Sequence, residues 1–123
     1  MKSARISILT SGHPCRNPRP VKEAAALAAA GYDVTLITPA FDPRLAEIDA
    51  ALLAGARFRH QAAPVRRTFF RRLRRWLAVR ALRLGYESAY GLGDPAPLWG
   101  AVNSRQQDLV IVHNELPHWL GVR

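Results

Sequence analysis

The sequence predicts an α/β fold, a Rossmann-like parallel sheet with helices on both faces. A β-branched run at residues 5–10, an alanine-rich helix at residues 21–30 and a second strand at residues 33–38 follow one another closely. A strand, a helix and a strand at this spacing form a βαβ unit, whose crossover makes the two strands parallel. A continuous apolar run at residues 108–112 is typical of a strand buried on both faces of a parallel sheet.

Local signals mark the ends of this first unit. Gly12 closes the first strand, and a loop rich in proline and small polar residues leads to Pro20. Proline is tolerated in the first turn of a helix, so Pro20 marks the helix start. Gly31 suits the residue just past a helix end, and Pro39 is expected to stop the second strand.

Further elements are expected along the rest of the chain. Apolar periodicity and flanking glycines or prolines predict helices at residues 43–54, 65–90, 97–104 and 118–122. The alternation at residues 57–61 fits a third, edge-like strand, since one of its faces is charged. The sequence has no internal repeat and no low-complexity linker, so we expect one domain over residues 1–123.

The composition favours a folded protein with anionic partners. Nearly half of the 123 residues are hydrophobic, which argues against a disordered chain. Eighteen Lys and Arg residues against nine Asp and Glu give a formal net charge of +9. Such a field attracts nucleotide phosphates, nucleic acid or an anionic membrane surface. Lys2 and Lys22 are the only lysines, so arginine supplies nearly all of the positive charge.

The remaining composition points to a cytoplasmic protein. Cys15 is the single cysteine, so no internal disulfide is possible. The apolar run at residues 6–9 is too short for the core of a signal peptide. No segment approaches the roughly 20 apolar residues that span a bilayer.

The candidate site lies where the first and last strands end. In an open parallel sheet, ligands bind beyond the carboxyl ends of the strands, at the point where the strand order reverses. In the common order 3-2-1-4, the first and last strands are neighbours across that point, so the loops after them face each other. The candidate residues in these two loops are Gly12, His13, Arg16, Arg19, His113, Asn114 and Glu115.

These residue types suit two kinds of chemistry. A helix amino terminus with arginines nearby suits an anion such as phosphate. An imidazole beside a carboxylate suits hydroxyl recognition or proton transfer. The first loop lacks the glycine patterns of a classical dinucleotide site or a P-loop, and no Cys/His spacing indicates a metal. Glu23 is interpreted as a residue that caps or pairs within its own helix.

Two stretches of the chain resemble a known family. Residues 5–10 form a first strand, and residues 17–24 and 30–37 read Asn-Pro-Arg-Pro-Val-Lys-Glu-Ala and Ala-Gly-Tyr-Asp-Val-Thr-Leu-Ile. Residues 108–115 read Asp-Leu-Val-Ile-Val-His-Asn-Glu. In this order the segments resemble the first domain of family-4 glycosyltransferases with the GT-B fold.

The resemblance implies a retaining hexosyltransferase built from two Rossmann-like domains. In that family the first domain mainly holds the acceptor, and the second binds the nucleotide sugar. The resemblance therefore implies that residues 1–123 are an incomplete acceptor-side domain, inactive without the donor-binding domain. The expected partners are a nucleotide sugar, as co-substrate, and a glycan or lipid-linked acceptor. No resident cofactor and no metal are expected.

The resemblance also implies roles for individual residues. His113 matches the family's histidine that lines the donor-sugar site, and it is the expected catalytic residue. Gly12 matches the first loop, which approaches the donor phosphates. The remaining candidates, expected to contact acceptor or donor, are His13, Arg16, Arg19, Asn114 and Glu115.

Structural interpretations of the same residues stay open. His113 also fits a polar residue that caps a strand or a helix. Arg19 and Lys22 also fit solvated first-turn residues, although positive charge there is unfavourable unless an anion is present. The whole chain also fits a non-catalytic Rossmann-like interaction module with a basic surface.

The arginine-rich helix at residues 65–90 has its own alternatives. Phe69, Phe70 and Trp76 share one face with other apolar residues. Its opposite face carries Arg67, Arg71, Arg74 and Arg75. A solvated basic face and docking on an anionic membrane, at the inner face of the plasma membrane, both fit this pattern. Nucleic acid is not expected as a partner, because no recognised binding module accompanies the charge.

Overall fold

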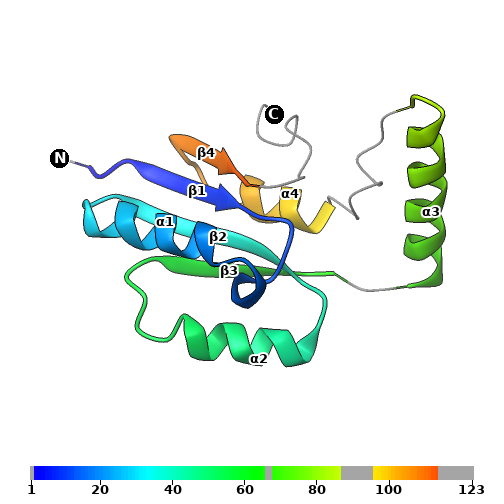
Figure 1. Cartoon of the computed structure of the whole chain (residues 1–123). Coiled ribbons are helices and arrows are strands. Elements are labelled where there is room, and N and C mark those ends of the chain that lie inside the picture. The colour runs from blue at the N-terminus through cyan, green and yellow to red at the C-terminus, as the bar shows by residue number, and fades with distance from the viewer. Residues whose placement is uncertain (1, 66–67, 87–95, 114–123) are drawn as a thin grey trace.

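The computed structural model describes residues 2–65, 68–86 and 96–113. Within them, four parallel strands form one sheet in the order β3-β2-β1-β4 (Figure 1). The strands are β1 (Arg5–Leu9), β2 (Asp33–Ala40), β3 (Arg59–Pro64) and β4 (Leu109–Val112). The predicted α/β class, parallel pairing and strand order are therefore confirmed.

Helices lie on both faces of this sheet. They are α1 (Pro18–Ala29), α2 (Pro43–Leu52), α3 (Phe69–Arg83) and α4 (Ala96–Asn103), with a short 3-10 helix, η1 (Pro14–Arg16), before α1. Helices α1 and α4 cover opposite faces, while α3 stands away from the sheet (Figure 1). Among the described helices, none has both the length and the apolar character that a membrane crossing requires.

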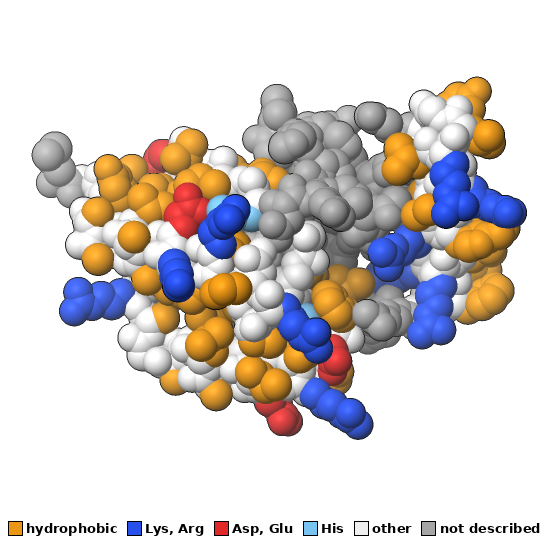
Figure 2. Space-filling model, in the orientation of Figure 1, with side chains coloured by type: hydrophobic (Ala, Val, Ile, Leu, Met, Phe, Trp, Pro, Cys, Tyr) orange, Lys and Arg blue, Asp and Glu red, His pale blue; other side chains and the backbone are white. Residues whose placement is uncertain are grey.

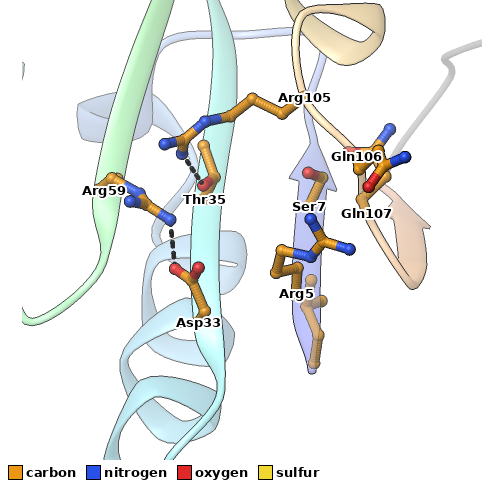
Figure 3. Close-up of a pocket in the computed structure, with 9 residues that line it drawn as sticks. Arg5, Ser7, Asp33, Thr35, Arg59, Arg105, Gln106 and Gln107 are labelled. Atoms are coloured by element: carbon orange, nitrogen blue, oxygen red, sulfur yellow. Dashed lines mark hydrogen bonds and ion pairs between the residues drawn. The ribbon is translucent and has the colours of Figure 1, made fainter. Parts of the chain in front are cut away.

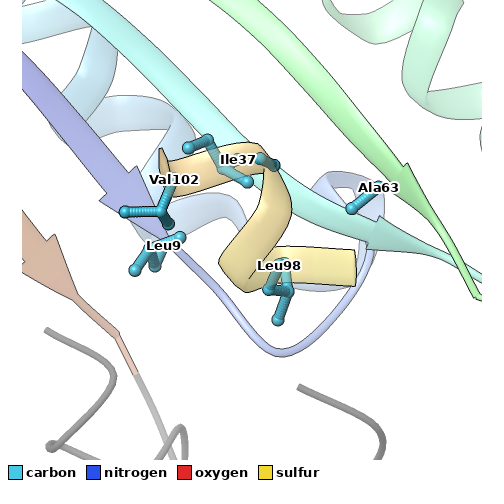
Figure 4. Packing of buried hydrophobic residues seen from close by; sticks show 6 residues of the cluster. Leu9, Ile37, Ala63, Leu98 and Val102 are labelled. Carbon is cyan, nitrogen blue, oxygen red and sulfur yellow. The ribbon is translucent and has the colours of Figure 1, made fainter. Parts of the chain in front are cut away.

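The core has two layers, one on each face of the sheet. Alternate residues of a strand point to opposite faces, so Ile8 and Leu9 enter different layers. The layer under α1 contains Ile6, Ile8, Ala24, Val34, Leu36 and Phe58. The layer under α4, drawn in Figure 4, contains Leu9, Ile37, Ala63, Leu98, Ala101 and Val102. This central burial fixes the positions of β1 and β2, whose ends carry the polar loops.

Strand β2 is longer than predicted, because it continues through Pro39 to Ala40. Proline disrupts a sheet when its missing N–H leaves a ladder bond unmade. In a parallel strand alternate residues face the same neighbour, and the Ile37 carbonyl accepts from Thr10 N on the β1 side. Pro39 therefore faces the side where β1 has already ended. Ala40 faces β3, and its carbonyl accepts from Val65 N at 2.9 Å.

Other boundaries also moved from their predicted places. Helix α3 begins at Phe69 rather than residue 65, because the Thr68 side chain caps it by accepting from Arg71 N at 3.3 Å. It ends before Gly85, whose φ of +90° suits a glycine at a helix end. Strand β3 runs later than the predicted 57–61. The helix predicted at 118–122 lies outside the described residues.

We expect Ile8→Ala to lower the free energy of unfolding by about 2–5 kcal/mol. Ile8 is 0% exposed in the central strand, so the truncation removes packing from a layer with no room to relax. Urea unfolding followed by circular dichroism measures the loss. Ile48→Ala, on the exposed side of α2, is the matched control and should cost less than about 1 kcal/mol. Equal losses in the two variants would contradict the described core.

Candidate functional site

The site lies at the carboxyl ends of β1 and β4. These strands are neighbours, and the chain leaves β1 toward β2 and β3 on one side while β4 lies on the other. The strand order therefore reverses at this edge, as the sequence predicted. His113 extends the ladder by one residue beyond β4, because its backbone N–H donates to Leu9 O at 2.9 Å. Its imidazole is consequently held at the switch point.

The structure brings His113 together with Glu23. The His113 Nε2 and Glu23 Oε2 atoms are in direct hydrogen-bond contact, although 90 positions separate the two residues. Glu23 lies in the second turn of α1, the helix that follows the first loop. The side chains are 17% and 34% exposed, so the pair is partly shielded yet reachable from solvent. The sequence predicted that Glu23 caps or pairs within its own helix. Its side chain instead contacts His113, just beyond the end of β4.

This contact assigns one imidazole proton, and within the described part of the chain no hydrogen bond occupies the other ring nitrogen. An ionised carboxylate only accepts hydrogen bonds, so His113 Nε2 carries a proton toward Glu23. In the neutral ring Nδ1 then accepts a hydrogen bond, and in the charged ring it donates one. A carboxylate that orients a histidine in this way is the arrangement used for proton transfer or hydroxyl recognition. Sequence reasoning missed Glu23, whose only signal was its place in the resembling segment at residues 17–24.

His13 has a different environment, since it is buried and only 1% exposed. Its Nδ1 donates to Asp49 Oδ2 at 2.6 Å. Its Nε2 accepts from the backbone N–H groups of Phe41 and Asp42 at 3.4 and 3.3 Å, and the Phe41 ring packs edge-on against it. Both ring nitrogens are thus occupied by the protein itself. The structure places His13 as a tie between the first loop, the end of β2 and α2.

Asp49 is the acceptor on which this tie depends. It accepts from the His13 ring and from Cys15 N, the latter at 2.8 Å. Burial raises the pKa of Asp49, but hydrogen bonds from His13 and Cys15 outweigh it and hold the pKa below its usual value. The hydrogen bond to Asp49 also raises the pKa of the Cys15 thiol. Cys15 therefore remains a neutral thiol near pH 7 and is a poor nucleophile.

A third histidine, His60 of β3, joins the same polar layer. Its Nε2 lies 2.8 Å from Thr38 Oγ1. Burial lowers the pKa of His60, so its ring is neutral near pH 7. This contact joins the later part of β2 to the beginning of β3 through neutral, hydrogen-bonded side chains.

Gly12 lies in the open part of the first loop. Thr10 Oγ1 donates to Gly12 O at 2.8 Å and so fixes the backbone there. A Cβ atom built on Gly12 would meet no described atom within 4 Å. The described residues thus leave room beside this glycine, and a phosphate facing Gly12 stays a prediction.

Arg16 and Arg19 are exposed beside the start of α1. The helix starts earlier than predicted, and this leaves it few backbone donors. Asn17 N–H donates to Pro14 O, and the prolines at positions 18 and 20 have no N–H. Arg19 thus supplies the one remaining backbone N–H of the first turn. An anion here would depend on the guanidinium groups of Arg16 and Arg19 more than on backbone amides.

Other predicted residues cannot be placed in the site. Asn114, Glu115 and Arg67 lie outside the described residues. Within residues 2–65, 68–86 and 96–113, no group of three or more His, Cys, Asp or Glu side chains is arranged to hold a metal ion. The structure brings His113 and Glu23 into contact, while Gly12 lies in the loop after β1, and Arg16 and Arg19 lie in η1 and in the first turn of α1.

Comparison with known proteins adds no assignment. No protein-family model matches the chain, and no match was found among curated proteins or solved structures.

We expect Asp49→Asn to lower the free energy of unfolding by about 1–3 kcal/mol at pH 7, because a buried charge-assisted hydrogen bond is weakened. The folded-state pKa of Asp49 is depressed, so its contribution is complete above the unfolded value of 3.8 and is lost as the pH falls below it. The variant should therefore lose less stability than the wild type between pH 5 and about pH 2.

Urea unfolding at a series of pH values measures this difference. Glu47→Gln, an exposed carboxylate of the same helix, is the control and should behave like the wild type. An unchanged acid profile for Asp49→Asn would show that the buried pair does not anchor the loop.

Proposed function

We propose that this chain is the acceptor-side part of a retaining, nucleotide-sugar-dependent hexosyltransferase. The contact between His113 and Glu23 carries the proposal. It places an oriented, solvent-reachable imidazole at the switch point of a Rossmann-like sheet, which is where ligands bind in such sheets. The resemblance of residues 5–10, 17–24, 30–37 and 108–115 to family-4 glycosyltransferases supports the same activity.

The proposed mechanism gives each group a limited role. A retaining displacement depends on stabilising the leaving phosphate more than on a strong base. Arg16 and Arg19 provide positive charge beside the open backbone at Gly12, where the donor phosphates would approach. His113 holds a sugar hydroxyl near the reacting carbon, and Glu23 keeps its imidazole in position. The nucleotide itself would be held mainly by a second domain of the full-length protein.

We expect His113→Ala to lower kcat/KM about 100-fold in the full-length protein that contains this chain, the loss typical of a positioned proton donor or acceptor. Glu23→Gln should lower it less, because Glu23 acts through the imidazole. Release of nucleoside diphosphate from a panel of nucleotide sugars measures turnover. In Glu23→Gln, the pH dependence of kcat/KM should also move, which a purely structural residue would not cause.

Lys22→Gln is the matched control, because Lys22 is the exposed neighbour of Glu23 on α1. It should retain wild-type turnover. Near-normal turnover in His113→Ala would exclude a catalytic role for this residue. No release from any nucleotide sugar by the wild type would contradict the proposed activity.

A second candidate function, a membrane-docking module, is favoured by the surface of α3. Phe69, Phe70, Trp76 and Leu77 are all more than half exposed. Ala78 is the buried residue of this helix, and it lies nine positions and two and a half turns from Phe69, on the opposite side. The Phe69 side of the helix is therefore exposed to solvent, and Figure 2 shows hydrophobic side chains beside Lys or Arg side chains on this helix.

This combination suits an anionic bilayer. Aromatic and leucine side chains enter the boundary between headgroups and acyl chains, while arginines contact the phosphates. Arg80 lies over the Trp76 ring at 4.5 Å and keeps a cation beside the apolar side. The cytoplasmic face of the plasma membrane, which carries anionic lipid, is the surface with this chemistry.

We expect the chain to bind vesicles that contain anionic lipid and not neutral vesicles, with binding lost as salt rises from about 0.1 M toward 1 M. Phe70→Ser should weaken binding about tenfold, because a 75% exposed ring would otherwise be buried in lipid. Leu52→Ser, at a 54% exposed apolar residue of α2, is the control and should bind normally. Vesicle co-sedimentation measures both. Equal binding to neutral and anionic vesicles would exclude the membrane interpretation.

A further inference from the structure

A polar pocket of about 240 Å³ occupies the edge of the sheet opposite to His113. It lies at the amino ends of the strands, where β1, β2 and β3 begin and where the chain enters β4 (Figure 3). Its walls are formed by Arg5, Ile6, Ser7, Asp33, Thr35, Arg59, Arg105, Gln106 and Gln107. Most of these side chains are polar, whereas the faces of a parallel sheet are usually apolar.

The pocket exists because one face of the sheet is apolar near the carboxyl ends of the strands and polar near their amino ends. The face under α4 carries Leu9 and Ile37 near the carboxyl ends of the strands and Ser7 and Thr35 nearer the amino ends. Helix α4 has eight residues and is about 12 Å long, so it covers the apolar half and leaves the polar half open. Ser7 and Thr35 are nevertheless only 5% exposed each, which places their hydroxyls at the floor of a recess.

Three arginines line this recess and are incompletely neutralised. Arg59 pairs with Asp33, and Arg5 Nε lies 3.6 Å from Asp108 Oδ2. Arg105 Nη1 donates to Thr35 Oγ1 at 3.4 Å, and no carboxylate pairs with Arg105 among the residues that the structure describes. In Figure 3 the side chains of Arg105 and Arg59 both extend to β2, Arg105 to Thr35 and Arg59 to Asp33. Arg59 keeps Asp33 as its partner, so Arg105 is the cation of this recess whose charge an added anion would balance.

Two buried polar atoms beside the recess make no hydrogen bond within the described residues, although one of them, Arg5 Nε, is ion-paired with Asp108 Oδ2 at 3.6 Å. Arg5 Nε and Gln107 Oε1 are shielded from solvent without a hydrogen bond to any described residue. Native proteins rarely keep buried polar atoms without a hydrogen bond. The guanidinium that matches an added oxyanion is that of Arg105, which has no carboxylate partner among the described residues.

We propose that this pocket binds a phosphoryl group, either free phosphate or the phosphate of a small ester. The guanidinium fork of Arg105 pairs well with phosphate oxygens, and Arg59 and the Thr35 hydroxyl supply further donors. The volume is below the roughly 300–1,000 Å³ of pockets that enclose drug-sized ligands, so an intact nucleotide sugar is too large. Because the pocket and His113 lie at opposite ends of β1 and β4, this site is separate from the proposed transferase site.

The test measures binding of inorganic phosphate and of glucose 6-phosphate to the full chain by isothermal titration calorimetry, at constant ionic strength kept with sodium chloride. Saturable binding of either compound with one site is expected. Arg105→Gln should weaken it at least tenfold. Arg105 is exposed, so this variant should keep the wild-type unfolding midpoint.

Arg44→Gln is the matched control, since it removes the same charge from the exposed start of α2. It should bind like the wild type. Tighter binding of glucose 6-phosphate than of phosphate would identify a small ester as the ligand, and the reverse would identify free phosphate. Thr35→Val is a second variant, which removes the hydroxyl at nearly constant shape and should also weaken binding.

Two results would overturn the proposal. One is the absence of saturable binding of either compound. The other is an equal loss in Arg105→Gln and Arg44→Gln, which would mean that the net charge of +9 attracts anions without a built site. Neither result bears on turnover at His113, so the two proposals fail independently.

Discussion

Strand β1 is hydrogen-bonded on both sides, and this central position determines where His113 and the polar pocket lie. Its register pairs Ile8 with Leu36 of β2 and with Ile111 of β4, so a single buried residue aligns three strands. The alignment brings the carboxyl ends of β1 and β4 together, which puts His113 within reach of α1. It also brings Arg5 and Thr35 to one recess at the other end. Both polar regions are therefore consequences of one packing arrangement, and a shift in the register of β1 would dismantle them together.

The first loop depends on a second constraint, the buried hydrogen bond from His13 to Asp49. A polar pair excluded from water is favourable only when its remaining hydrogen-bonding groups are also satisfied. Here the second ring nitrogen accepts two backbone N–H groups, and the carboxylate accepts a further one from Cys15. The loop is thus fixed at its centre, while Gly12 on one side and Arg16 on the other remain open. A rigid centre with open flanks is the preorganisation that ligand recognition by a loop requires.

The parts that the sequence predicted are those governed by local rules. Crossover geometry and β-branched runs determine the βαβ unit and the buried strand at Leu109–Val112, so the strand order followed. The burial of His13 could not be predicted, because it depends on Asp49, which lies 36 positions away. His13 and His113 both follow a strand, so their positions in the sequence do not distinguish the buried histidine from the reachable one. The contact of Glu23 with His113 spans 90 positions and has no periodic signal. The sequence predicts a strand end at Pro39, because it does not show that β1 stops before it could pair with this residue. The sequence does not predict the pocket, because Arg5, Thr35 and Arg59 have the residue types of solvated positions near the beginning of a strand.

The arginines of the chain lie in regions of different shape, and these shapes suit different anionic ligands. Dispersed arginines would be solvated at little cost, whereas converging ones raise the energy of the fold unless anions neutralise them. Arg16 and Arg19 flank an open loop, Arg59 and Arg105 line a recess, and the arginines of α3 border an exposed aromatic surface. A loop flanked by arginines suits a diphosphate that arrives with a larger ligand, a recess suits a small phosphate, and a convex helix suits a bilayer. The shape of each region, more than the net charge, therefore distinguishes the anionic ligands that it suits.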